Sequence, residues 1–118
     1  MNGRVERGQL VIIESPYAGD LERNVAYARA AMRDSLRRGE YPIASHLIYT
    51  QPGILRDEVP AERELGIRAG LAWRRAADLA VFYIDLGWSG GMTAARSVYE
   101  LEQFPFAERS LGWVKADG

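Results

Sequence analysis

The chain contains 118 residues, a length that supports one small domain with a single hydrophobic core. Its formal net charge is −1, which gives no indication of binding to bulk nucleic acid or to an acidic membrane surface. The absence of cysteine excludes disulfides, thiolate catalysis and Cys-ligated zinc, and the single histidine, His46, excludes a multi-histidine metal site but leaves a carboxylate-only Mg²⁺ site open.

Apolar runs, capping residues and turn residues predict alternating strands and helices. Leu10–Glu14 is a β-branched apolar run, typical of a central parallel strand that is covered on both faces. Asp20 is the expected N-cap of the next helix, and Pro60 suits the first turn of a later one. In chain order we expect a strand over 10–14, a helix over 21–38, a strand over 41–45, a long connection over 46–59, a helix from 60 to about 77, a strand over 79–85, a helix after the paired glycines at 90 and 91, and a strand over 107–111.

This β-α-β-α-β-α-β order favours parallel pairing through crossover connections. We therefore expect an α/β fold, a small Rossmann-like three-layer sandwich with a four-stranded parallel sheet. We expect a single domain over residues 1–118, with loose ends at 1–8 and 112–118.

Two loops follow predicted strands that end in an acid. Glu14 leads into a loop over 15–19, and Asp85 leads into Gly-Trp-Ser-Gly-Gly at a predicted helix start. Open α/β sheets bind ligands at the carboxyl ends of their strands, so these two loops indicate a nucleotide-sized pocket. The backbone amides of residues 89–91 can hold a phosphate, although the same residues also suit a plain strand-to-helix turn.

Several side chains near these strand ends are candidates for ligand contacts, and each has a structural alternative. Tyr17 either stacks on a base or covers the core, and we favour stacking. Asp85 is the acid that we expect to bind a sugar hydroxyl. His46 is either a ligand-binding or a structural histidine, and Trp88 is either a pocket wall or an oligomer contact. We take residues 49–51 as ordinary loop residues.

Four features, in this order along the chain, form a pattern. They are the loop Glu14-Ser15-Pro16-Tyr17-Ala18-Gly19, Asn24 on the first helix, Ala44-Ser45-His46 after the second strand, and an acid plus Gly-Trp-Ser-Gly-Gly after the third. Over roughly residues 9–111, the pattern resembles the nucleoside 2-deoxyribosyltransferase-like superfamily, in particular its small uncharacterised bacterial and phage branches and the nucleotide N-glycoside hydrolases of the same fold. The resemblance implies a nucleotide or nucleoside ligand, N-glycosidic cleavage or deoxyribosyl transfer, and a pocket completed by a neighbouring chain.

The resemblance also implies a catalytic Glu one turn into the helix after the glycine loop, where it attacks the anomeric carbon or stabilises its oxocarbenium character. In this sequence that position holds Ala95. The next acid, Glu100, lies more than a turn (~5.4 Å) further along the helix. Glu14, Asp85 and Glu64 are the substitutes that the sequence offers, and we rank Asp85 and Glu14 first.

These observations predict a nucleotide- or nucleoside-binding protein, which is either an N-glycoside hydrolase or deoxyribosyltransferase, or a catalytically silent binder that senses or sequesters a nucleotide signal in phage–host conflict. The expected catalytic residues are Asp85 and Glu14, and the expected ligand-binding residues are Ser15, Tyr17, Asn24, His46, Trp88, Ser89, Gly90 and Gly91. We expect no metal and no cofactor, since the Gly-x-Gly-x-x-Gly turn of redox-cofactor sites is absent after the first strand.

The sequence also carries expectations about location and partners. No apolar segment follows Met1 and no apolar run is long enough to span a bilayer, so we expect a cytoplasmic protein without membrane or bulk nucleic-acid partners. Trp73 and Trp88 add apolar area to a small domain, which favours a homodimer or a higher homo-oligomer.

Overall fold

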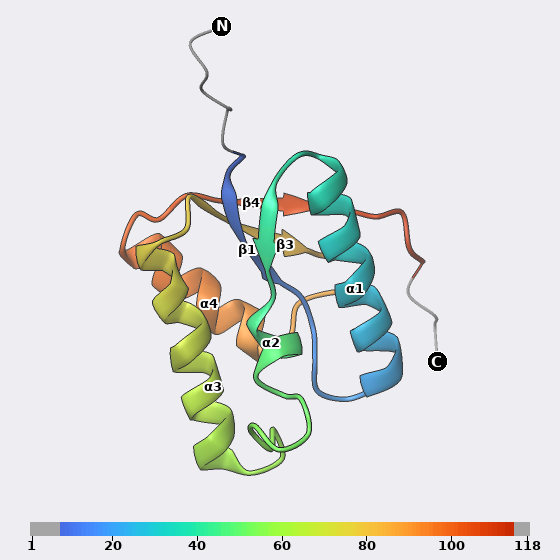
Figure 1. Ribbon diagram of the computed structural model, residues 1–118, viewed down its shortest axis with the longest axis vertical. Coiled ribbons are helices and arrows are strands. Elements are labelled where there is room, and N and C mark those ends of the chain that lie inside the picture. Colours follow the sequence, from blue (N-terminus) through green and yellow to red (C-terminus); the bar gives the residue numbers. More distant parts are fainter. Residues whose placement is uncertain (1–7, 115–118) are drawn as a thin grey trace, which may run out of the picture.

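The computed structural model describes residues 8–114 and has an α/β fold with four parallel strands in the order β2-β1-β3-β4 (Figure 1). This is the small Rossmann-like three-layer sandwich that the alternating sequence predicts. Its elements are β1 (Leu10–Glu14), α1 (Leu21–Arg37), β2 (Tyr41–Ile43), α2 (Ser45–Ile48), α3 (Pro60–Ala72), the 3₁₀ turn η1 (Trp73–Arg75), β3 (Leu79–Tyr83), α4 (Gly90–Leu101) and β4 (Phe106–Arg109).

The two central strands, β1 and β3, divide the core into two halves because successive side chains point to opposite faces of the sheet. On β1, Val11 and Ile13 pack on the face that α1 covers, together with Tyr27. Ile12 packs on the other face with Met92 and other residues of α4. Figure 1 shows α1 and α4 on opposite sides of the sheet.

Local signals end and begin the helices that flank the site. The Asp20 side chain accepts a hydrogen bond of 3.1 Å from the backbone N–H of Arg23 and caps α1. Gly39 ends the same helix with a φ of +83°, a conformation that glycine adopts without steric cost. Ser89 caps α4 by accepting a hydrogen bond of 3.2 Å from the N–H of Met92.

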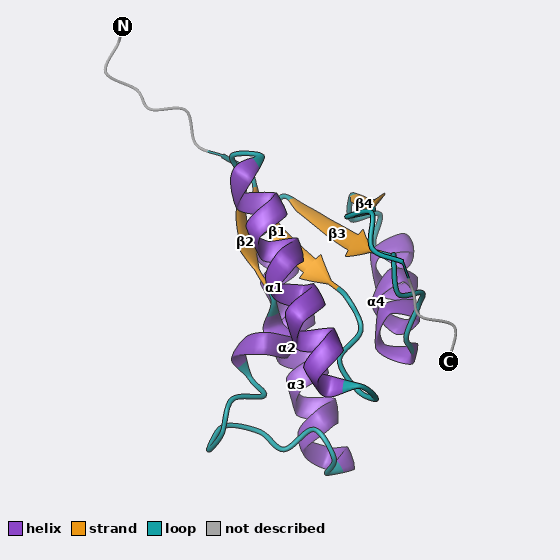
Figure 2. Cartoon of the chain, turned by 90° about the vertical axis from the view of Figure 1, so that its right-hand side faces the viewer, coloured by secondary structure: helices purple, strands orange, loops and turns teal. Residues whose placement is uncertain are grey.

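The boundaries of several elements differ from the sequence-based expectation. The second strand stops at Ile43, because the Ala44 carbonyl accepts hydrogen bonds from the N–H groups of Leu47 and Ile48 and starts α2. The helix expected to reach about residue 77 is α3, which ends at Ala72 and tightens into η1. Figure 2 shows α2 and α3 lying beyond the carboxyl ends of β1 and β2, where a ligand site is expected.

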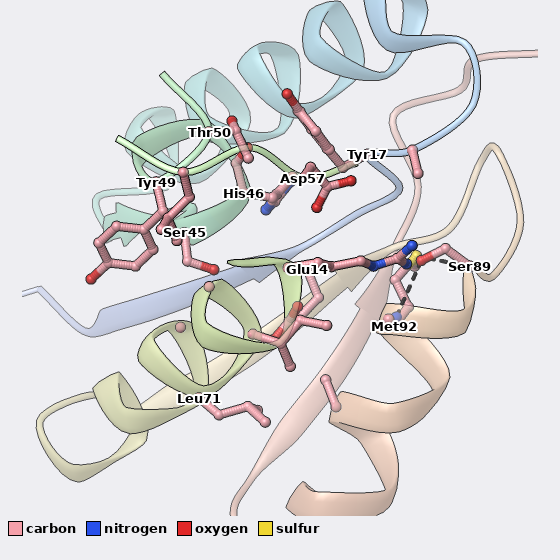
Figure 3. Close-up of a pocket in the computed structure, with 18 of the residues that line it drawn as sticks. Glu14, Tyr17, Ser45, His46, Tyr49, Thr50, Asp57, Leu71, Ser89 and Met92 are labelled. Carbon is pink, nitrogen blue, oxygen red and sulfur yellow. Dashed lines mark hydrogen bonds between the residues drawn. The ribbon is translucent and has the colours of Figure 1, made fainter. Parts of the chain in front are cut away.

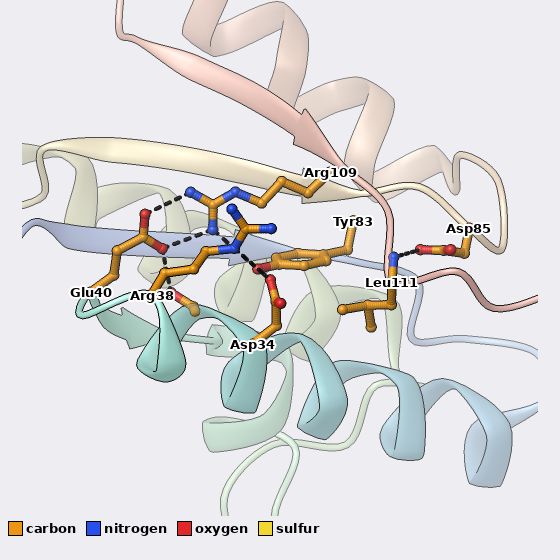
Figure 4. Close-up of polar contacts among 8 residues, drawn as sticks. Asp34, Arg38, Glu40, Tyr83, Asp85, Arg109 and Leu111 are labelled. Carbon is orange, nitrogen blue, oxygen red and sulfur yellow. Dashed lines mark hydrogen bonds and ion pairs between the residues drawn. The ribbon is translucent and has the colours of Figure 1, made fainter.

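The last two strands are also displaced from the expected ranges, and Asp85 is the reason. β3 ends at Tyr83 and β4 covers Phe106–Arg109, because the chain after β4 turns onto the Asp85 carboxylate (Figure 4). That carboxylate accepts hydrogen bonds from Ser110 Oγ at 2.7 Å, from the N–H of Leu111 at 2.8 Å and from the N–H of Trp113 at 2.9 Å.

Within the expected loose end from residue 112, Trp113 is held to the domain, whereas Val114 is 91% exposed. The Trp113 ring packs edge-on against Tyr27 with the ring centres 5.1 Å apart. The remaining expected loose residues, 1–7 and 115–118, lie outside the described part of the chain. No helix in the described part is long and apolar enough to cross a membrane.

Candidate functional site

A pocket opens at the carboxyl edge of the sheet, between β1, α2, α3 and the start of α4 (Figure 3). Its inner cavity measures about 120 Å³, and a wider groove of about 750 Å³ continues outward between the loop after β1 and α3. The two share Tyr17, Thr50, Asp57 and Arg63 among their lining residues. The inner cavity is lined by Glu14, Ser15, Tyr17, Ala18, Ser45, His46, Tyr49, Thr50, Leu55, Asp57, Glu62, Arg63, Gly66, Ile67, Gly70, Leu71, Ser89, Gly91, Met92 and Ala95.

Glu14, the last residue of β1, brings a carboxyl group into the cavity. Tyr99 on α4 donates a hydrogen bond of 2.5 Å to Glu14 Oε2. Within the described residues, no hydrogen bond or ion pair reaches Glu14 Oε1. Burial raises the pKa of Glu14 to about 7, and the Tyr99 hydrogen bond offsets only part of that rise. The carboxyl group therefore exchanges a proton near neutral pH.

Ser15 and His46 form a hydrogen-bonded pair beside Glu14. Ser15 Oγ lies 2.7 Å from His46 Nε2, which links the loop after β1 to α2. Burial lowers the pKa of His46 to about 4, so the imidazole is neutral at physiological pH. In its neutral form the ring has one N–H donor and one acceptor nitrogen, and the pair therefore offers neutral polar groups to a ligand.

Asn24 shapes the loop that carries Tyr17 but does not line the cavity. Its side chain is 1% exposed, and its Nδ2 donates to the carbonyl oxygens of Tyr17 at 2.9 Å and Ala18 at 3.1 Å. One side chain thereby binds two carbonyls of the loop, which fixes the backbone of the loop. Asn24 is a positioning residue for Tyr17.

The start of α4 forms another wall of the cavity. Ser89, Gly91, Met92 and Ala95 all line it. Ser89 already satisfies the N–H of Met92 through its side chain, so the cap and the first turn are held rigidly beside the cavity. The positive end of the helix dipole favours a negative charge at this wall.

Charged side chains from α3 and the loop before it complete the lining. Arg63 lines both the cavity and the groove, and no ion pair to it occurs among residues 8–114. Asp57 and Glu62 also face the cavity, and Glu62 accepts a hydrogen bond of 3.0 Å from the N–H of Arg56. Across the described residues, no group of three or more His, Cys, Asp or Glu side chains is arranged to hold a metal ion.

Comparison with known proteins places the chain in a family. Residues 9–109 match the family model described as "Domain of unknown function (DUF7768)". The chain belongs to this family. The match covers all four strands and every element that lines the pocket, so the pocket is part of the DUF7768 domain itself. No curated protein matches the sequence.

The DUF7768 pocket brings together six of the side chains or loop residues that the sequence singled out. These are Glu14, Ser15, Tyr17, His46, Ser89 and Gly91. Ala95, at the position where the resemblance implies a catalytic Glu, also lines the cavity as a small apolar residue. The agreement follows from the carboxyl ends of parallel strands meeting at one edge of the sheet.

Four other expected site residues do not line the pocket. Asp85 lies on the α1 side of the sheet, where Tyr27, Ser110 and two backbone amides bind its carboxylate and hold its pKa at about 2. Trp88 packs on Phe82, with ring centres 4.8 Å apart. Gly90 and Asn24 are not among the residues that line the cavity. The structure therefore corrects the placement of Asp85: it fastens the C-terminal segment and does not face the cavity.

The sequence does not predict the α3 wall or the Tyr99 hydrogen bond, and Tyr49 and Thr50 are expected as ordinary loop residues. Gly66 and Gly70, one turn apart, are a signal for the α3 wall. A Cβ at Gly70 would lie 2.4 Å from Ser45 Oγ, so glycine allows α3 to approach α2 closely. Tyr99 follows Ala95 by one helical turn, and this spacing places both on the same face of α4.

Proposed function

We propose that this DUF7768 domain binds a nucleotide or nucleoside derivative in the pocket at the carboxyl edge of its sheet. The observation that carries the proposal is the lining of the cavity. It combines a guanidinium that has no ion-pair partner among the described residues, Arg63, with the N-terminal turn of α4. Both groups favour an anion such as a phosphate.

The remaining lining suits the rest of such a ligand. Tyr17 presents an aromatic ring at the boundary of the cavity and the groove, where a base can stack. Asp57 offers a carboxylate to sugar hydroxyls at the same boundary. The inner cavity of about 120 Å³ admits only part of a nucleotide, and the groove of about 750 Å³ has space for the remainder.

Two forms of this function follow from different residues of the pocket. The resemblance to the nucleoside 2-deoxyribosyltransferase-like superfamily favours cleavage of an N-glycosidic bond or deoxyribosyl transfer. The alanine at position 95 favours a silent binder, because a methyl group can neither attack nor stabilise an anomeric carbon. Glu14 favours an enzyme, because it brings a carboxyl group into the same cavity from β1.

The phosphate contact is tested by comparing Arg63→Gln with the wild-type protein in calorimetric titrations. Deoxynucleoside 5′-monophosphates and the matching nucleosides serve as ligands. We expect the substitution to weaken the binding of the monophosphates at least tenfold and to leave nucleoside binding within twofold, since only the phosphate carries charge. Arg75→Gln, in the turn η1 that follows α3, is the matched control, because Arg75 lines neither the cavity nor the groove. If no nucleotide or nucleoside binds the wild-type protein, the proposal is wrong.

We also propose that the domain forms a homodimer or a higher homo-oligomer. Of the residues of α3, only Gly70 is buried, and Leu65, which lines neither the cavity nor the groove, is 46% exposed. Trp73, at the end of the same helix, is 42% exposed. Exposed apolar side chains of this size favour self-association. Light scattering over micromolar concentrations should give a multiple of the 13.2 kDa chain mass, whereas a monomer mass at every concentration would refute the proposal.

A further inference from the structure

We propose that Glu14 is a catalytic acid of this site, which donates its proton to the departing base of a bound nucleotide while water attacks the sugar. The proposal rests on the nucleotide-binding function proposed above and adds a reaction and a residue to it. Its basis is the position of the Glu14 carboxyl group, which is fixed on one oxygen and open to the cavity on the other.

The fixed oxygen is Oε2, which accepts the 2.5 Å hydrogen bond from Tyr99. No side-chain nitrogen or oxygen that is fully buried lacks a hydrogen-bond partner in the described part of the chain. Since Oε1 has no partner there, it is in contact with the open space of the cavity. Tyr99 therefore holds the carboxyl group by one oxygen and leaves the other free for a ligand, and Figure 3 shows Glu14 among the residues that line the cavity.

The neighbouring residues leave the Glu14 carboxyl group without a cationic partner and accessible from the cavity. Ala95, one turn before Tyr99 on α4, lines the cavity with only a methyl group and leaves room beside the carboxyl. No Arg or Lys forms an ion pair with Glu14 among the described residues. Burial without a neighbouring cation favours the protonated form of Glu14. Its pKa of about 7 leaves about half of the molecules protonated at neutral pH. An acid poised near the working pH is the form that catalyses proton transfer best.

Other titratable groups face Glu14 from the elements packed around the cavity. They are Tyr17 from the loop after β1, His46 and Tyr49 from α2 and its end, Asp57 from the loop before α3, Glu62 and Arg63 from α3, and Tyr99 from α4. The His46 imidazole, with its pKa of about 4, holds no extra proton to donate at neutral pH. Glu14, with its pKa of about 7, carries a transferable proton near neutral pH.

The reaction balances with water as the only co-reactant. The C1′–N bond of the nucleotide breaks, and its electron pair goes to the base nitrogen, which takes the proton from Glu14. A water molecule forms the new C1′–O bond, and the proton that it loses returns to the Glu14 carboxylate. The products are the free base and the sugar phosphate, and the acid is regenerated. General acid catalysis of this kind contributes roughly 10²–10⁴-fold.

The test measures base release from deoxynucleoside 5′-monophosphates by chromatography, alongside ligand binding by calorimetry. We expect Glu14→Gln to lower the rate of base release at least 100-fold while the dissociation constant stays within threefold. Glu100→Gln, which removes an exposed carboxylate on α4 that lies 3.8 Å from Arg96, should retain the wild-type rate. The wild-type rate should fall as the pH rises through about 7, because the proton on Glu14 is then lost.

Tyr99→Phe supplies a second test that does not depend on the folding of Glu14→Gln. The Tyr99 hydroxyl lowers the pKa of Glu14, so its removal should move the fall in rate to higher pH. An unchanged pH profile in Tyr99→Phe, or wild-type release by Glu14→Gln, would overturn the role of Glu14. So would a sugar found covalently attached to Glu14. Binding without base release by the wild-type protein would remove the catalytic proposal and leave the binding function intact, whereas an absence of binding would remove both.

Discussion

The two buried titratable groups of the pocket should give the protein opposite and separable dependences of stability on pH. The pKa of Glu14 is raised from 4.5 to about 7, and that of His46 is lowered from 6.5 to about 4. Each displacement is worth about 3 kcal/mol, at about 1.4 kcal/mol per pH unit.

The signs of the two effects differ. Glu14 is protonated in the folded protein where the unfolded chain has lost its proton, so its contribution is complete below pH 4.5 and is lost as the pH rises to about 7. His46 is neutral in the folded protein where the unfolded chain binds a proton, so its contribution is present above pH 6.5 and is lost as the pH falls to about 4. Between pH 5 and 6.5 the two slopes nearly cancel.

Glu14 and His46 are replaced one at a time by glutamine, which is uncharged and similar in size. In Glu14→Gln, the slope from His46 remains, and the free energy of unfolding should rise by about 2 kcal/mol from pH 5 to 6.5. In His46→Gln, the slope from Glu14 remains, and the same quantity should fall by about 2 kcal/mol over that range. The wild-type protein should show a much flatter profile.

The assay is urea denaturation at half-unit pH steps. The difference in unfolding free energy between variant and wild type is plotted against pH, and its slope is compared with the prediction. Packing that is lost in a variant shifts this difference by the same amount at every pH and leaves the slope unchanged. The pKa values of Asp34, Glu40 and Asp85 are lowered in the folded protein, and a start at pH 5 keeps their titration out of the range. Parallel profiles for the wild type and both variants would refute the reasoning, because neither group would then be buried as described.

Two further predictions concern residues outside the cavity. Asp85→Asn should speed hydrogen exchange of the amides at Leu111 and Trp113 and cost about 2 kcal/mol of stability, since a charged acceptor of several hydrogen bonds is lost; unchanged exchange would contradict its role as the anchor of this segment. Asn24→Ala leaves the carbonyls of Tyr17 and Ala18 without their donor, so the unfolding free energy should fall by about 2 kcal/mol and nucleotide binding should weaken, and normal binding by a destabilised variant would separate the loop from the ligand.

Much of this architecture can be predicted from the sequence because the signals are local. The apolar runs of β1 and β3 and the helix caps at Asp20 and Ser89 depend on neighbouring residues, and they predict the order of the elements and the edge of the sheet where the loops gather. The α3 wall depends instead on contacts between distant parts of the chain. Its helix buries only Gly70, so it carries no apolar stripe that would predict where it packs.

The different positions of Glu14 and Asp85 follow from the alternation of side chains along a strand. Ile13 packs on the α1 face, so Glu14 points to the opposite face, toward α4 and the cavity. Tyr83 also packs on the α1 face, and Asp85, two residues later, lies on that same side. Both are acids near the end of a central strand. The alternation of side chains, followed from the core residues Ile13 and Tyr83, distinguishes the carboxyl group in the pocket from the structural one.

The most direct test of nucleotide binding at this pocket is a calorimetric titration of two neighbouring glycine variants with a deoxynucleoside 5′-monophosphate. Gly91 lines the cavity, and a Cβ there would lie 3.9 Å from Ser89 Oγ, an ordinary contact distance, so Gly91→Val adds bulk to the wall. Gly90 lies outside the lining and has no atom within 4 Å of an added Cβ, so Gly90→Val is the matched control. We expect Gly91→Val to weaken binding at least tenfold and Gly90→Val to bind like the wild type. Equal binding by Gly91→Val and the wild type would show that the nucleotide does not occupy this pocket.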